Sequence, residues 1–101
     1  MEREFNYNVA EHELTLLGEE EAEFSKKAED GGILYLFADR SFQSLDFTAC
    51  IMWNVISQHH SFQKAKEEIL KVFCAGDNQD VSGDVSDFFD FLTETGAIQV
   101  I

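Results

Sequence analysis

The chain has no proline, only two cysteines and only seven basic residues among its 101 positions. Cys50 and Cys74 both fall inside apolar helical patterns rather than in the regular spacing of a disulfide scaffold, so we expect free thiols in a reducing compartment. No apolar run approaches the roughly 18 residues that span a bilayer, and no positively charged leader with an apolar stretch opens the chain. These absences predict a cytoplasmic protein that does not enter a membrane.

The shortage of Lys and Arg also limits the partners that the chain can have. Twenty Asp and Glu residues stand against seven basic residues, which gives a formal net charge of −13. A protein that binds nucleic acid or an anionic membrane must neutralise phosphates with basic side chains, so we expect neither partner. The acidity either serves solubility alone or also selects basic partners.

Apolar residues, in contrast, are plentiful. They make up 45% of the chain and include ten Phe, one Trp and two Tyr. Large aromatic side chains bury much surface, so one domain of this size can form a core without metals or disulfides. Residues 1–20 are polar with scattered apolar positions and are interpreted as a loosely docked arm without firm structure, whereas residues 21–101 are interpreted as the domain itself.

Three short strands are predicted in the first half of that domain. Residues 21–27 alternate small or apolar with polar side chains, as a partly buried strand does, although their acidic run also suits a helix. The turn cluster 28–32 leads into the apolar run 33–37, and a second turn at 39–41 leads into residues 42–45. Together these segments predict an antiparallel meander.

Three helices are predicted to follow. The first begins at Asp46, a good N-cap, and runs to about residue 58, with Cys50 opposite its apolar face; the second begins at Ser61, with Val72 on its apolar face, and ends near Cys74. The third covers about residues 81–95 and stops at Gly96, and residues 97–101 form a terminal strand or simply pack. A three-stranded antiparallel sheet followed by three helices is an α+β, winged-helix-like fold.

The third predicted helix is the most informative segment. Its apolar face consists of Val85, Phe88, Phe89 and Leu92, and a separate acidic stripe consists of Asp84, Asp87, Asp90 and Glu94. Phe91 projects beside that stripe, which makes it a better candidate for a groove than Phe88 and Phe89, whose aromatic rings are more often core.

No arrangement of residues predicts catalysis. His59 and His60 are adjacent, whereas ligands on a helix need a spacing of three or four, and neither Cys50 nor Cys74 lies in a basic setting that lowers a thiol pKa. The glycines lack the spacing of a phosphate-binding loop. We therefore predict no enzymatic activity, no cofactor and no metal.

Three stretches of the sequence, in order, resemble a known family. Leu45-Asp46-Phe47-Thr48-Ala49, followed by Ile51 and Trp53, resembles the family pattern Leu-Asn-x-Thr-Ala with a downstream Ile-Trp. Ser61-Phe62 with Ile69-Leu70 and Phe73 is similar to its second helix, and Asp84-Val85-x-x-Phe88-Phe89-x-x-Leu92-x-x-x-Gly96-Ala97-Ile98 is similar to its third helix and closing segment. This is the pyrroloquinoline quinone biosynthesis protein D family (PqqD-like), whose domain is also called the RiPP precursor peptide recognition element. The resemblance covers about residues 21–98; Asp46 stands where the family usually has Asn, and Ala97 where Leu is common.

The resemblance implies a non-catalytic domain of natural-product biosynthesis that binds the leader segment of a ribosomally synthesised precursor peptide. Such a domain presents the peptide to a maturation enzyme, for example a radical SAM protein, a protease or a cyclase. Family members add the leader as a strand against strand three, beside helix three. Carried over to this sequence, the peptide-binding residues are Arg40, Ser41, Phe42, Gln43, Ser44 and Leu45, together with Val81, Asp84, Val85, Phe88 and Phe91.

Elementary physical chemistry agrees with strand addition. The unpaired amides and carbonyls of an edge strand can be completed by an extended peptide, with side-chain pockets supplying specificity. Apolar pockets from Phe42, Val85 and Phe88, with carboxylates at Asp84 and Asp87 nearby, predict a leader with spaced apolar residues and at least one Lys or Arg.

Two other interpretations remain open. A winged-helix DNA-binding or transcriptional adaptor protein has the same element order, but it should show a basic helix face, and the third helix carries four acids and no Lys or Arg. An exposed sheet edge can also pair with a second copy of the chain, so a homodimer is compatible with the sequence.

Overall fold

The structure, a computed structural model, describes residues 4–73 and 79–101. The predictions for Cys74 and for the turn at 75–78 lie outside these residues. Within the described ranges the elements are, in chain order, β1 (Tyr7–Val9), β2 (His12–Leu16), α1 (Phe24–Ala28), β3 (Gly32–Leu36), β4 (Ser41–Leu45), α2 (Phe47–Ile56), α3 (Phe62–Val72), α4 (Gln79–Thr95) and β5 (Ile98–Val100).

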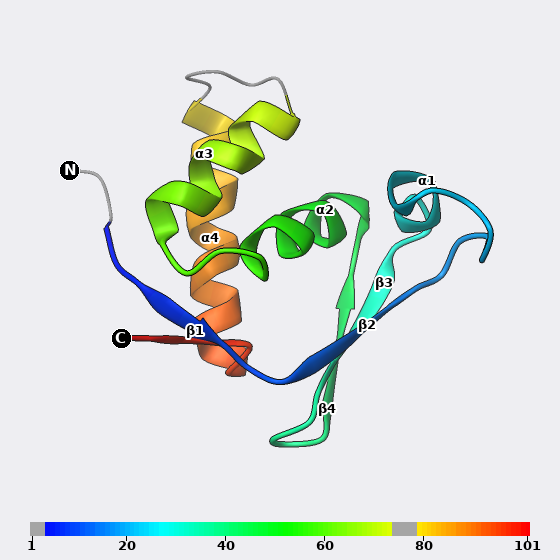
Figure 1. Cartoon of the computed structure of the whole chain (residues 1–101), viewed down its shortest axis with the longest axis horizontal. Helices are drawn as coiled ribbons and strands as arrows, with labels where there is room; N and C mark the ends of the chain where they lie inside the picture. The colour runs from blue at the N-terminus through cyan, green and yellow to red at the C-terminus, as the bar shows by residue number, and fades with distance from the viewer. Residues whose placement is uncertain (1–3, 74–78) are drawn as a thin grey trace.

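The main sheet is antiparallel and has the strand order β2-β3-β4. Leu34 of β3 lies opposite Leu14 of β2 and Gln43 of β4, and all three belong to the face that is turned toward the helices. Helices α2, α3 and α4 follow this sheet in sequence (Figure 1). The predicted α+β fold, a three-stranded antiparallel sheet followed by three helices, is confirmed; a second, two-stranded sheet of β1 and β5 adds to it.

The prediction of a first strand at residues 21–27 is wrong. Phe24–Ala28 form the short helix α1 instead, in which Phe24 and Ala28, four positions apart, both pack against the core. Over so few residues, alternation and helical spacing select the same apolar positions, so the pattern alone does not decide between them. The strand that completes the meander is His12–Leu16, whose burial alternates as a partly buried strand requires.

Residues 1–20 are therefore not a loosely docked arm where the structure describes them. β1 pairs with β5, with Tyr7 opposite Val100, and the amide of Tyr7 donates to the carbonyl of His60 at 2.8 Å. The ring of Phe5 lies 5.0 Å from that of Phe62 and 5.7 Å from that of Phe89. The scattered apolar positions of this segment are thus anchors in the core rather than marks of a frayed end.

Capping contacts confirm the predicted starts of α2 and α3 and the predicted end of α4, whereas α2 ends at Ile56 and α4 begins at Gln79, about two positions earlier than predicted in each case. The Asp46 side chain accepts a 2.8 Å hydrogen bond from the amide of Ala49, and Ser61 accepts one from the amide of Lys64. At the end of α4, Gly96 adopts φ +86°, and the amide of Ala97 donates to the carbonyl of Leu92, which is the six-to-one bond of a Schellman motif. Among the described helices, none has the length and apolar character needed to cross a membrane.

The core surrounds α2. Cys50, Ile51, Met52, Trp53 and Ile56 are all buried, because α1, α3 and β4 all pack against this helix. The prediction that Cys50 lies opposite the apolar face is wrong for this reason, since a helix enclosed on several sides has no single apolar stripe. In α3 the prediction that Val72 lies on the apolar face is wrong, since Val72 is 54% exposed, whereas Phe73 packs against the core.

Candidate functional site

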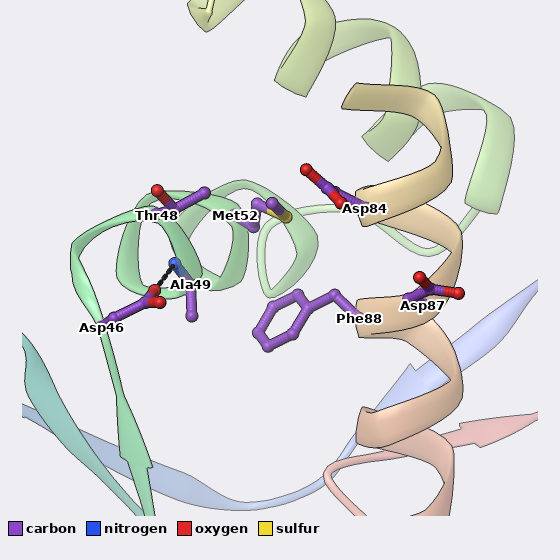
Figure 2. Close-up of a pocket in the computed structure, with 7 residues that line it drawn as sticks. All are labelled: Asp46, Thr48, Ala49, Met52, Asp84, Asp87 and Phe88. Atoms are coloured by element: carbon purple, nitrogen blue, oxygen red, sulfur yellow. Dashed lines mark hydrogen bonds between the residues drawn. The ribbon is translucent and has the colours of Figure 1, made fainter. Parts of the chain in front are cut away.

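A hollow of about 460 Å³ lies between the start of α2 and the middle of α4. Figure 2 shows the ring of Phe88 extending from α4 toward Ala49 of α2, with Met52 deeper along the same helix. The residues that line the hollow are Asp46, Thr48, Ala49, Met52, Asp84, Asp87 and Phe88. Two helices that are separated in the sequence by the whole of α3 therefore form one site.

The hollow combines apolar walls with three carboxylates. Ala49, Met52 and Phe88 supply the apolar surface, while Asp84 and Asp87 supply carboxylates from α4. A third carboxylate, that of Asp46, is held in place because it caps α2 (Figure 2). No Lys or Arg is among the lining residues, so the local charge is negative.

The edge of the main sheet next to the hollow belongs to β4. Within residues 4–73 and 79–101, β4 pairs on one side with β3, and no strand pairs with its other side. The amino-terminal segment contributes β2 to the opposite edge, so it does not occupy the edge of β4. Asp46 directly follows β4 and caps α2, which places the end of this edge at the hollow.

The predicted site residues on β4 divide between the two faces of the sheet. Ser41 and Gln43 are partly buried on the face toward the helices, and the Ser41 hydroxyl is buried without a hydrogen-bond partner among the described residues. Leu45 is buried and belongs to the core. Phe42 and Ser44 are exposed on the outer face, so Phe42 does not share a pocket with Phe88, in contrast to the predicted apolar pocket.

Arg40 precedes β4, in the turn that joins it to β3. It is exposed and adopts φ +52°, a left-handed conformation that is uncommon for residues other than glycine. Its predicted role in peptide binding stays a prediction.

The predicted site residues on α4 also differ in placement. Asp84 and Phe88 line the hollow, whereas Val85 is fully buried and acts from the core beneath it. Phe91 and Val81 are partly buried against the core, and the Phe91 ring stacks on that of Phe88 at a centroid distance of 6.0 Å. Phe88 is thus the aromatic of α4 that enters the hollow, although the sequence pattern favoured Phe91 as the groove candidate.

Sequence reasoning missed the contribution of α2 to the site. Thr48, Ala49 and Met52 line the hollow, and their spacing of one, three and four positions marks a single helical face. A signal was present, since Thr48 and Ala49 belong to the stretch that carries the family resemblance. What the sequence could not show is that this face lies opposite Phe88.

A second feature, on the outer face of the sheet, is a group of aromatic rings. Tyr35 lies opposite Phe42 in the β3–β4 register, and their rings are 4.7 Å apart. The ring of Phe37 lies 4.9 Å from that of Tyr35. Phe42 is 68% exposed, so this aromatic group reaches the free edge of β4 with one face uncovered.

The surroundings of the Cys50 thiol lower its reactivity. Burial, and then the negative charge of Asp46, raise the pKa of the Cys50 thiol, which makes the nucleophilic thiolate scarce near neutral pH. The thiol points at the carbonyl of Leu45, 3.8 Å away. In the part of the chain that the structure describes, no three His, Cys, Asp or Glu side chains are grouped so that they could hold a metal ion.

Comparison of the chain with protein-family models, with curated proteins and with solved structures found no match.

Proposed function

We propose that this chain binds an extended peptide as an added strand on the free edge of β4, beside the hollow between α2 and α4. The observation that carries the proposal is the edge of β4, which no described strand covers and which ends at a hollow large enough for side chains. A guest strand would complete the amides and carbonyls of β4, while its side chains would enter the hollow.

The resemblance suggests which peptide this is. The stretches 45–53 and 84–98 contribute the α2 and α4 walls of the hollow, and Thr48, Ala49, Asp84 and Phe88 both line it and match the pattern of the recognition-element family. We infer that the guest is the leader of a ribosomally synthesised precursor peptide, and that the chain presents it to a separate maturation enzyme. The free thiol of Cys50 fits a reducing compartment and supports a cytoplasmic location.

A role in binding DNA is disfavoured by charge. Asp84, Asp87, Asp90 and Glu94 are exposed on α4, the helix that would have to approach phosphates in a winged-helix reader. Pairing of β4 with a second copy of the chain would use the same edge as a guest peptide, so it would compete with peptide binding. A homodimer formed in this way would show a sedimentation mass that rises with protein concentration.

The direct test is a titration with a labelled leader peptide encoded by a short reading frame beside that of this chain, followed by fluorescence anisotropy. We expect saturable binding with Kd below about 100 µM, which is about 5.4 kcal/mol of binding free energy. Sedimentation of the protein without peptide should show a monomer. A dimer that peptide does not dissociate would contradict the use of β4 for the guest.

Strand addition itself can be tested on the peptide. In an extended strand, alternate amides point toward the same neighbour, so we would N-methylate either the odd or the even amides of the leader. Methylation of the amides that face β4 should abolish binding, and methylation of the other set should leave binding nearly unchanged. Equal loss from both sets would mean that the peptide does not bind as a strand.

The hollow can be tested with one substitution. Ala49→Gln places a longer neutral side chain opposite Phe88, and Gln is compatible with the third helical position after the Asp46 cap. We expect a loss of peptide affinity of about tenfold or more with unchanged circular dichroism. The matched control is Ala22→Gln, the same change at another partly buried alanine, which precedes α1. Equal losses of peptide affinity in both variants would show that the hollow does not bind the peptide.

A further inference from the structure

The two faces of β4 offer a guest strand two different surfaces. Side chains of a guest that pairs with β4 alternate between the faces, as those of β4 do. The outer face presents the aromatic group that ends at Phe42, and the inner face leads to the hollow with its carboxylates. Alternate residues of the guest strand therefore face either the aromatic group or the hollow with its carboxylates.

On the outer face the complement is an apolar or aromatic side chain. The guest residue directly across from Phe42 would lie on the same side of the sheet, at the distance of a cross-strand pair. Phe42 is 68% exposed although its ring contacts that of Tyr35, so a guest ring there would cover surface that the fold leaves in water.

On the inner face the complement is a long cationic side chain. Ala49, Met52 and Phe88 provide apolar contact for an alkyl stem, and Asp84 and Asp87 provide charged acceptors. These carboxylates are not grouped as a metal site among the described residues. With no Lys or Arg lining the hollow, a cation from the guest is the charge complement that the site lacks.

We propose that the guest is recognised through an apolar residue over Phe42 and a Lys or Arg in the hollow, separated in the peptide by an odd number of positions. This inference rests on the proposed strand addition and narrows its substrate class to a peptide with a two-sided pattern. The odd separation follows from the pleat, because residues an even number of positions apart lie on the same face.

The experiment uses labelled ten-residue Thr-rich peptides that contain one Phe and one Lys, at separations of two, three, four and five positions. At least one odd separation should bind about tenfold more tightly than both even ones, since a misplaced Lys loses its charged hydrogen bonds. Replacing Lys by norleucine in the best peptide should remove that advantage. Equal binding at all separations, or binding of the leader but of none of these peptides, would overturn the inference.

Variants of the protein test which face of β4 binds the Phe of the peptide and which binds its Lys. Asp84→Asn combined with Asp87→Asn should weaken the Lys peptide about tenfold and leave the norleucine peptide unchanged. The matched control, Glu67→Gln with Glu94→Gln, removes the same charge from exposed positions that do not line the hollow and should leave both peptides unchanged. Phe42→Ser should weaken peptides that contain Phe and not those with Thr in its place.

The failure of this inference can be separated from failure of the proposed function. If only one set of N-methylated amides abolishes leader binding, but the Lys charge and the Phe–Lys separation have no effect, strand addition is supported and the proposed recognition of one apolar and one cationic residue is wrong. If the leader does not bind at all, the proposed function falls as well.

Discussion

At the scale of single residues, Tyr7 links the amino-terminal segment to the centre of the fold. Its ring is fully buried, and its hydroxyl donates a 2.8 Å hydrogen bond to the carbonyl of Ile56 at the end of α2. Burial raises the pKa of Tyr7 above its ordinary value of about 10, because the fold disfavours the phenolate. The unfolded chain therefore loses this proton at lower pH than the folded chain does.

Tyr7 therefore stabilises the fold less at alkaline pH than at neutral pH. The contribution of Tyr7 is complete below about pH 10, where the phenol is neutral in both states, and is lost progressively as pH rises beyond that value. We expect Tyr7→Phe to lower the free energy of unfolding at pH 7 by about 1–2 kcal/mol and to show a shallower decline above pH 10, measured by urea unfolding. Tyr35→Phe, on the outer face, is the control for loss of a hydroxyl. Parallel alkaline declines in wild type and Tyr7→Phe would contradict this account.

Two glycines make a second residue-scale test because their environments are opposite. Gly31 has φ +84°, and a methyl group there would lie 2.6 Å from the carbonyl oxygen of Leu45. Gly83 lies in α4, and a methyl group there would meet no atom within 4 Å beyond the neighbouring backbone of its own helix. We expect Gly31→Ala to reduce the unfolding free energy by about 2 kcal/mol or more and Gly83→Ala to increase it by about 0.5–1 kcal/mol, both by urea unfolding. An unchanged or increased unfolding free energy for Gly31→Ala would show that the turn before β3 tolerates a side chain.

At the scale of elements, the start of α2 both caps a helix and shapes the site. Asp46→Ala removes the acceptor for the amide of Ala49 and should cost about 1 kcal/mol in thermal or urea unfolding, whereas Asp46→Asn should restore most of that loss. The Asn variant keeps the cap and removes one carboxylate from the hollow. It therefore separates the structural part of Asp46 from its charge in peptide titrations, and equal stability of the Ala and Asn variants would exclude the cap as the cause.

Element prediction succeeded where the signal was local. The caps at Asp46 and Ser61 and the stop at Gly96 satisfy backbone groups within a few residues, so the sequence alone located all three helix ends. It failed for α1 and β2, because short segments take the conformation that their packing partners favour. In β2 the alternation of residues 12–16 was readable, but the polar composition around it concealed the strand.

At the scale of the whole molecule, the two ends of the chain hold each other. β1 pairs with β5, and the backbone amide of Ile101 donates to the carbonyl of Asn6 at 2.9 Å. A chain that begins at residue 21, the domain start expected from composition, lacks both β1 and β2. We expect it to be unfolded by circular dichroism and NMR, and a separate peptide of residues 1–20 to restore the fold when added. A stably folded 21–101 fragment would contradict the role of these strands.

The sequence by itself determined the fold class, the starts of α2 and α3, the end of α4, the acidity of α4 and the aromatic richness of the core, because each depends on composition or on spacing within one element. Only the tertiary structure decided that Phe88 rather than Phe91 enters the hollow, that Val85 and Leu45 are core, and that Phe42 faces the other side of the sheet. The physical reason is that a side chain's partner on another element depends on how the elements pack, and periodicity records only which face of its own element it occupies.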